Sequence, residues 1–357
     1  MSLSIEEISE LFANSARQTE CVGHKKKVHC LAWNQQGTLL ASGSVDNTTR
    51  LWQFNSSGES VSVHELKGHS DSIDQLCWNP RRPNQLATTS SDKTVRIWDA
   101  KSGEQTHSVK TSGENINIAW SPDGSTICVG NKDDVLTFIE TRRFKVVSET
   151  KFDFEANEFC WSPNSEYFFL TAGQSDGSGS IEIIKFSKHK LDKSQSISLA
   201  GHGAACYCLA LCPTGRRLAV GAADSLVSLW DLDGLVCTAV VERLDWPVRT
   251  LGFSADGRLL AAAAEDHFVD ICDAATGRRV HAVQCDGALN AVAWRPVAAG
   301  GGGGYELAYA GDTRGGGGGG GAGENDRGAS RSSRRDDDNT AYVKLVGINT
   351  SSSTGKK

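Results

Sequence analysis

Apolar and polar residues alternate in short runs along most of the chain, and turn-forming residues separate these runs. The clearest example reads "GHSDSIDQLCWNP", then "NQLATTSSDKTVRIWDA" and then "GEQTHSVKT". A period of two, with Pro, Asn, Gly and Asp between the runs, predicts strands and not helices. This segment therefore predicts one four-stranded antiparallel sheet.

A large residue that follows an alternating run, often with a proline two positions later, recurs along the chain. The aligned large residues are Trp33, Trp78, Trp120, Trp161, Leu211, Phe253 and Trp294. Their spacings of 41 to 50 residues match the period of WD40 blades. The sequence therefore predicts an all-β fold, a WD40 β-propeller with seven blades. We attribute the longest interval to enlarged loops at "QSDGSGS" and "SKHKLDKSQ".

Blades one and two carry the same four side-chain types at matching positions. They are His24, Ser42, Asp46 and Trp52 in blade one, and His69, Thr88, Asp92 and Trp98 in blade two. At these residues the chain resembles the WD40 family, in which they form a buried hydrogen-bond chain from Trp through the hydroxyl and His to Asp. Because buried polar groups need partners, the resemblance implies that each set braces its blade and fixes one strand register.

The other blades keep this brace only in part. Blade five retains His202, Asp224 and Trp230. Val220 stands at its hydroxyl position, so we expect its hydrogen-bond chain to be interrupted. Blades three, four and six lack the tryptophan and are expected to rely on packing. The replacing residues are Ile139, Ile184 and Cys272.

The last blade supplies only three strands of its own, which we expect at 290–294, 305–310 and 341–346. The segment "QTECV" at 18–22 is the natural fourth strand. The two ends of the chain would then pair and close the ring, which removes an open sheet edge.

This closure suggests a domain organisation. Residues 1–17 form an N-terminal extension, 18–348 form the propeller, and 349–357 form a disordered tail. Glycine, serine and charged residues dominate 311–338, which predicts a disordered insertion in the last blade. Its stretch "RGASRSSRR" is compatible with RNA contact or phosphorylation, and also with a plain solvated linker.

Composition excludes several classes of function. The net charge of −6 gives no overall basic field, so we expect any RNA contact to be indirect. No apolar run approaches the ~20 residues of a membrane span, and no signal peptide is evident, so we expect no membrane association and reduced cysteines. Cys206, Cys208 and Cys212 alternate like a strand and lack a second ligand pair. We therefore expect no metal and no cofactor.

Catalysis requires a nucleophile with its base, or paired acids, converging on a pocket. The run Glu265, Asp266 and His267 is tempting, but Asp266 occupies the same turn position as the brace aspartates. No inward pattern of acids or histidines recurs across several blades, as an enzymatic propeller would need. We expect no catalytic residues; an interaction platform is the stronger hypothesis and a propeller enzyme the weaker one.

One of the nine tryptophans, Trp246 in "RLDWPVRT", fits neither the repeat nor the brace. Leu244 takes the place of the brace histidine there, so Trp246 either packs over its own blade or forms an exposed anchor. Asp245 and Arg249 flank it, and Trp and Arg are common in binding hot spots. We expect a partner-binding patch that comprises Trp246, Arg249, Asp245 and, from the equivalent strand position of blade two, Asp74.

A narrower resemblance rests on "GENIN", "GNKDDV" and "LDWPVRT", which are not general blade sequences. Over residues 24–297 the chain is similar to the THO complex subunit 3 family, the WD40 subunits of the THO/TREX assembly. The resemblance implies a non-enzymatic nuclear subunit that couples transcription and mRNA processing to mRNA export. Its implied partners are other THO subunits, chiefly the large helical scaffold, and indirectly a DEAD-box ATPase and export adaptors. The alternative is a WD40 subunit of a chromatin-modifying complex, whose channel mouth should be acidic or form an aromatic cage.

Overall fold

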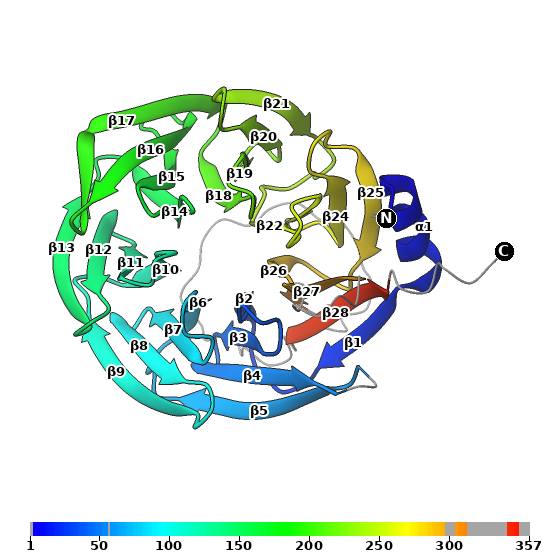
Figure 1. The fold of residues 1–357 in the computed structure, drawn as a ribbon, viewed down its shortest axis with the longest axis horizontal. Coiled ribbons are helices and arrows are strands. Elements are labelled where there is room, and N and C mark those ends of the chain that lie inside the picture. The colour runs from blue at the N-terminus through cyan, green and yellow to red at the C-terminus, as the bar shows by residue number, and fades with distance from the viewer. Residues whose placement is uncertain (1–2, 56–57, 297–303, 313–340, 350–357) are drawn as a thin grey trace, which may run out of the picture.

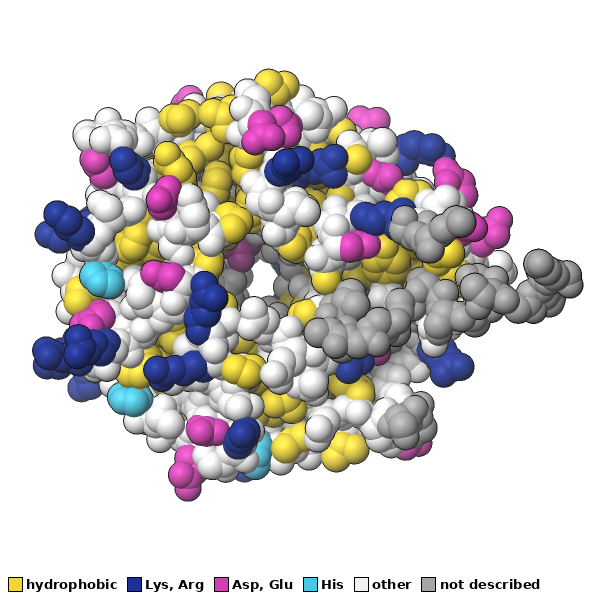
Figure 2. All heavy atoms as spheres, in the orientation of Figure 1, with side chains coloured by type: hydrophobic (Ala, Val, Ile, Leu, Met, Phe, Trp, Pro, Cys, Tyr) yellow, Lys and Arg dark blue, Asp and Glu magenta, His cyan; other side chains and the backbone are white. Residues whose placement is uncertain are grey.

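The computed structural model describes residues 3–55, 58–296, 304–312 and 341–349. Seven four-stranded antiparallel sheets surround a central channel as the blades of a propeller (Figure 1). The channel opens at the centre of the face shown in the space-filling view (Figure 2). The prediction of an all-β, seven-bladed propeller is confirmed.

Blades one to six each take four consecutive strands, counted from the channel outward. In blades one to three these are β2 (Val28–Trp33), β3 (Leu40–Ser44), β4 (Thr48–Phe54) and β5 (Ser60–Lys67); β6 (Ile73–Trp78), β7 (Gln85–Ser90), β8 (Thr94–Asp99) and β9 (Glu104–Lys110); β10 (Asn115–Trp120), β11 (Thr126–Asn131), β12 (Val135–Glu140) and β13 (Lys145–Lys151). In blades four to six they are β14 (Glu155–Trp161), β15 (Tyr167–Gly173), β16 (Gly179–Ser187) and β17 (Lys190–His202); β18 (Cys206–Leu211), β19 (Arg217–Ala222), β20 (Val227–Asp231) and β21 (Val236–Val241); β22 (Thr250–Phe253), β23 (Leu259–Ala263), β24 (Phe268–Asp273) and β25 (Arg279–Gln284).

The seventh blade closes the ring with strands from both ends of the chain (Figure 1). Its own strands are β26 (Leu289–Trp294), β27 (Gly304–Asp312) and β28 (Ala341–Asn349). The fourth is β1 (Arg17–Cys21), which pairs antiparallel with β28. The predicted ring closure is confirmed, although the closing strand begins one residue earlier than expected.

An N-terminal helix, α1 (Ile5–Ser15), precedes the closing strand. The side chains of Ser4 and Glu7 form a capping box that satisfies backbone donors at its start. Ile8 and Phe12 are buried in the core shared with β25 and β28. The helix therefore covers the outer side of blades six and seven beside the ring closure. No helix in the described part of the chain is long and apolar enough to cross a membrane.

Two expected loops differ from their prediction. Gly311 and Asp312 belong to β27, so the insertion cannot begin at 311; its remaining expected residues, together with 350–357, lie outside the described part of the chain. The extra residues of "SKHKLDKSQ" lengthen a hairpin instead of a loop. Strands β16 and β17 are joined by a tight turn at Lys188 and His189, both with positive φ.

Four of the aligned tryptophans, Trp33, Trp78, Trp161 and Trp294, tie their blade to the preceding one. The indole Nε1 of Trp78 donates to the Ala32 carbonyl of the preceding blade at 2.9 Å. Trp294 does the same to Gly252 at 2.9 Å. The repeated residue thus contributes both buried apolar surface and a satisfied buried donor between blades.

The brace residues of blades one and two form continuous hydrogen-bond chains. In blade two, His69 Nδ1 lies 2.8 Å from Asp92, and His69 Nε2 lies 2.9 Å from the Thr88 hydroxyl. Trp98 Nε1 donates to the same hydroxyl at 2.9 Å. Blade one repeats these contacts at 2.7 to 2.9 Å among its four equivalent residues. The imidazole, indole and hydroxyl groups of both braces are therefore partnered, as burial requires.

Blade five has a complete chain, so the predicted interruption at Val220 is wrong. The Ser228 hydroxyl lies 2.8 Å from His202 Nε2, and Trp230 Nε1 donates to it at 2.8 Å. Ser228 pairs with Val220 across the β19–β20 ladder, so the hydroxyl comes from the neighbouring strand. His202 Nδ1 contacts Asp224 at 3.0 Å. Blade five is braced as the first two blades are.

Replacing Ser228 with alanine should lower the free energy of unfolding by about 1–3 kcal/mol, because His202 and Trp230 lose their shared partner. Adding Val220→Ser to Ser228→Ala should recover part of the loss, since it returns a hydroxyl to the strand position used in blades one and two. Urea denaturation of the three proteins measures both effects. An unchanged free energy of unfolding for Ser228→Ala would mean that this hydroxyl does not bridge the brace.

Blades three, four and six rely on other interactions. Ile139, Ile184 and Cys272, which replace the brace tryptophan, are each no more than 2% exposed and belong to core clusters. Packing therefore substitutes for the indole at these positions.

Blade six also contains a buried ion network. The fully buried Asp270 carboxylate accepts from Arg243 Nη2 at 2.6 Å and Arg279 Nε at 2.7 Å. Arg243 stands where blade two has Gly68, and Asp270 stands where blade two has Arg96. A Cβ on Gly68 would lie 2.5 Å from Arg96 Nη1, so this space holds one long side chain. In blade six the long side chain is Arg243, at the position of Gly68, and Asp270, at the position of Arg96, neutralises its charge.

Candidate protein-interaction surface at the channel mouth

A ring of seven residues stands where the innermost strands begin. Register shifts near the starts of six of these strands push residues out of the ladder, as β-bulges do. In blade six the equivalent residue directly precedes β22. The mouth ring, as we call it, consists of His29, Asp74, Ile116, Asn157, Tyr207, Arg249 and Asn290. The repeated fold thus presents seven side chains of six different types at one end of the channel.

Part of the mouth ring is linked into a polar arc. Arg249 Nη1 donates to the Asn290 side chain at 3.3 Å, and Asn290 donates to Asp312 at 3.2 Å. Lys27 of blade one lies 3.2 Å from the same Asp312 carboxylate. The arc therefore joins blades six, seven and one through charge-assisted contacts.

Asp74 belongs to blade two, outside this arc. Its carboxylate accepts from the hydroxyls of Ser72 and Ser91, and it lies 3.6 Å from His29. Its contacts are thus within blades one and two. The structure places Asp74 at the same strand position as Arg249 but brings it into no contact with Trp246 among the described residues.

The loop that carries Trp246 is held by its backbone. Asp266 accepts from the backbone N–H of Asp245 at 3.1 Å and of Trp246 at 3.4 Å. Leu244, which stands at the position of the brace histidine, is buried at 5% exposed. The Trp246 side chain is 53% exposed. Leu244 therefore packs against the blade, and the Trp246 indole faces solvent. This arrangement favours the second interpretation, an exposed anchor.

Arg249 lies three residues beyond Trp246 and is partly exposed. Its guanidinium pairs with the Glu265 carboxylate in addition to Asn290. This pair fixes a cation three residues along the chain from an exposed aromatic ring. Such a combination suits protein recognition, because aromatic and arginine side chains dominate binding energy at interfaces.

Asp92→Ala should destabilise the protein more than Asp266→Ala. Asp92 accepts from His69, from the Ser70 backbone, and from the backbone and hydroxyl of Thr94, whereas Asp266 accepts from two backbone donors. Each donor left unsatisfied in a buried site costs ~1–3 kcal/mol, so the difference should be of that order. Thermal melts of both variants test this, and equal shifts would contradict the brace assignment.

A second set of polar contacts lies along the channel wall, where Gln75 also accepts from the Ile118 backbone of blade three. Gln75 of blade two donates to the Glu158 carboxylate of blade four at 2.9 Å, and the Leu209 backbone donates at 3.3 Å. Burial raises the pKa of Glu158 to about 7. Sequence analysis missed Glu158; its signal was a carboxylate directly before the apolar end of the innermost strand, "EFCW".

Glu158 should make stability depend on pH. The folded protein binds this proton more tightly than the unfolded chain, so stability should fall as the pH rises from 4.5 to about 7. The loss should be on the order of 2 kcal/mol. Glu158→Gln should abolish this component, whereas Glu155→Gln, an exposed change on the same strand, should retain it. Urea denaturation across this pH range would contradict the account if wild type and Glu158→Gln changed in parallel.

Asp266, considered for catalysis, and Cys206 and Cys208, considered for metal binding, have structural roles. Asp266 is engaged by the loop backbone, as described above. Burial raises the pKa of the Cys206 thiol to about 12 and that of Cys208 well above its usual value. Within the described ranges, no group of three or more His, Cys, Asp or Glu side chains is arranged to hold a metal ion.

Comparison with known proteins identifies close relatives. The sequence model of the THOC3 beta-propeller domain matches residues 24–299. THO complex subunit 3 of Arabidopsis thaliana is 48% identical over 301 residues, which cover 84% of this chain and 90% of that protein. The WD repeat-containing protein AAC3 of Dictyostelium discoideum is 31% identical over 81% of this chain and 64% of its own length. More distant proteins match too; the nuclear distribution protein nudF of Aspergillus niger is 27% identical over 77% of this chain and 56% of its own length.

Proposed function

The chain belongs to the THOC3 beta-propeller family, and we propose that it is a non-enzymatic scaffold subunit of a THO complex. In this role it would help couple transcription and mRNA processing to mRNA export in the nucleus. Its direct partners would be other THO subunits, chiefly the large helical scaffold. Export adaptors and a DEAD-box ATPase would be reached through those subunits.

The observation that carries the proposal is the exposed Trp246 on an anchored loop beside the mouth ring. An aromatic side chain that is 53% exposed leaves about half of its surface for a partner to cover. Its backbone is fixed by Asp266, so little conformational entropy would be lost when a partner covers it. The proposed binding patch is Trp246 with Asp245 and Arg249; Asp74 would contribute only to a partner that spans the channel mouth.

Contact with RNA is proposed to be indirect. The chain carries a net charge of −6, and acidic residues are frequent in the loops on the Trp246 side, including Asp71, Glu114, Asp133 and Asp153. This side of the propeller would repel a phosphate backbone and favour protein partners.

The chromatin alternative has less support. A reader of basic histone tails would need an acidic or aromatic-caged channel mouth. The mouth ring contains one acid, Asp74, and one aromatic residue, Tyr207, together with a cation, Arg249. This mixture suits a partner surface with several kinds of side chain and not a cage for one basic residue.

The test is to purify the tagged full-length chain from a nuclear extract after nuclease treatment and to identify the copurifying proteins by mass spectrometry. We expect the other THO subunits, retained without nucleic acid. Recovery of histone-modifying subunits without THO subunits would instead establish the chromatin alternative.

A further inference from the structure

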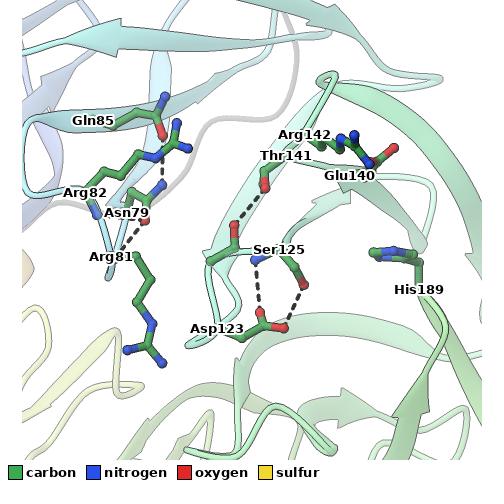
Figure 3. A pocket seen from close by; sticks show the side chains of 11 residues that line it. Asn79, Arg81, Arg82, Gln85, Asp123, Ser125, Glu140, Thr141, Arg142 and His189 are labelled. Carbon is green, nitrogen blue, oxygen red and sulfur yellow. Dashed lines mark hydrogen bonds between the residues drawn. The ribbon is translucent and has the colours of Figure 1, made fainter.

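A polar cavity of about 420 Å³ lies between blades two and three (Figure 3). It is formed by the β6–β7 and β10–β11 loops, the β12–β13 turn and the tip of the β16–β17 hairpin. In antiparallel blades these connections lie at the end opposite to the Trp246 loop. The charged or titratable residues of the lining are Arg81, Arg82, Asp123, Glu140, Arg142 and His189.

The two arginines of the β6–β7 loop are held in place. The Asn79 side chain, which is 3% exposed, accepts from the backbone N–H groups of Arg81 at 2.8 Å and Arg82 at 3.1 Å. Arg81 Nε also donates to the Pro122 carbonyl of blade three at 3.0 Å. This bond fixes the Arg81 guanidinium at the cavity and leaves its terminal nitrogens for another acceptor.

The cavity arginines are not neutralised by ion pairs. Several arginines elsewhere are paired with carboxylates; they include Arg50 with Glu65, Arg249 with Glu265 and Arg295 with Glu306. By contrast, Arg81, Arg82 and Arg142 have no carboxylate within 4.0 Å among the residues that the structure describes.

The acids in the lining do not cancel these charges. Both oxygens of Asp123 accept from neighbours: Oδ1 from the Ser121 hydroxyl at 2.6 Å and the Ser125 backbone at 3.0 Å, and Oδ2 from the Ser125 hydroxyl at 2.8 Å. Glu140 is the remaining acid, against three guanidinium groups. The cavity therefore carries net positive charge on a chain whose net charge is −6.

His189 reaches the cavity from blade four. The lengthened β16–β17 hairpin has its tip at Lys188 and His189, and His189 Nδ1 lies 2.8 Å from the Thr126 hydroxyl of blade three. The Ser148 hydroxyl donates to the His189 carbonyl. These contacts hold the imidazole at the cavity edge in Figure 3, where Nε2 is the ring nitrogen left for a ligand.

We propose that this cavity binds a phosphomonoester, namely the phosphorylated serine or threonine side chain of a partner protein. Planar guanidinium groups donate in pairs to phosphate oxygens, and arginine clusters recognise phosphorylated motifs in this way. The cavity volume of about 420 Å³ suits a single phosphorylated side chain. Single-stranded RNA would instead need a continuous groove with aromatic platforms, and the lining contains no Phe, Tyr or Trp. The site is independent of the proposed THO role, because it lies on the other face.

The experiment uses the full-length chain and fluorescence anisotropy. The probes are a labelled glycine-serine peptide with one phosphoserine, its unphosphorylated twin and a short labelled oligouridylate; inorganic phosphate serves as a competitor. The test protein carries Arg82→Ala and Arg142→Ala, two exposed changes that should leave the thermal melt unchanged. The control is Arg216→Ala, an exposed arginine in a loop of blade five at the same end of the propeller.

We expect wild type and Arg216→Ala to bind the phosphopeptide and not its twin, and the double variant to bind it roughly tenfold or more weakly. Three results would overturn the proposal. The first is no preference for the phosphorylated peptide, and the second is equal binding by the double variant. The third is tighter binding of oligouridylate or of free phosphate, which would assign the cavity to RNA or to a small anion.

Discussion

Asp270→Ala should lower the free energy of unfolding by roughly 3 kcal/mol, the largest effect on stability that we expect from a single exchange. Asp270 is fully buried and pairs with both Arg243 and Arg279. Its removal leaves two cations packed against each other without a counter-charge. Both arginines keep some contact with solvent, so the cost should lie at the lower end of the range for a broken buried pair.

Urea denaturation of Asp270→Ala beside Glu65→Ala provides the comparison. Glu65 pairs with Arg50 at 2.9 Å on the surface of blade one, and such exposed pairs contribute about 1 kcal/mol or less. If the two variants lost the same stability, the buried network in blade six would stabilise the fold no more than an exposed ion pair does.

Trp246→Ala should weaken capture of the THO scaffold by roughly tenfold or more. An anchor tryptophan that becomes desolvated in a partner's pocket costs ~2–4 kcal/mol on truncation. Arg249→Glu should weaken capture to a smaller degree, since a partly exposed charge at an interface contributes less. Neither change should unfold the protein, because the loop is held by backbone donors to Asp266 and by the buried Leu244.

Pull-down from nuclear extract beside a thermal melt of each variant measures this. Tyr167→Ala is a matched control, because Tyr167 is 42% exposed but lies at the start of β15, on the opposite face. A fall of many degrees in the melt of Trp246→Ala, with a proportional fall in capture, would show that the indole stabilises a blade that lacks the brace histidine.

The architecture could be predicted from the sequence because the repeated residues have the same structural role in each blade where they occur. The aligned tryptophans recur at the WD40 period, and in the structure several of them join neighbouring blades. The missing fourth strand of the last blade identified the closing strand, which begins at Arg17 instead of Gln18. Strand ends are set by hydrogen bonds and are less sharply encoded than strand identity.

The details that escaped prediction depend on contacts across strands. Val220 occupied the expected hydroxyl position, and nothing in a linear alignment indicated that Ser228, on the next strand, reaches the same space. Blade two has Gly68 and Arg96 where blade six has Arg243 and Asp270. This difference becomes apparent only when the two positions of each blade are compared as a pair.

The candidate site was predictable only in part. Trp246 could be singled out because the repeat accounted for the other tryptophans, but its exposure follows from Leu244 and Asp266, which fix the loop from both sides. Asp74 was grouped with it by strand position alone, and the structure gives Asp74 its own partners in blades one and two. The bond between Gln75 and Glu158 depends on the arrangement of blades two, three and four around the channel, which a linear sequence does not display.

The most direct test measures, by calorimetry, the binding of the purified chain to the purified large helical THO subunit in the absence of nucleic acid. We expect a specific complex that survives nuclease treatment and is weakened by Trp246→Ala but not by Tyr167→Ala. A lack of binding, or binding that requires added RNA, would contradict the assignment of this propeller as a protein scaffold within a THO complex.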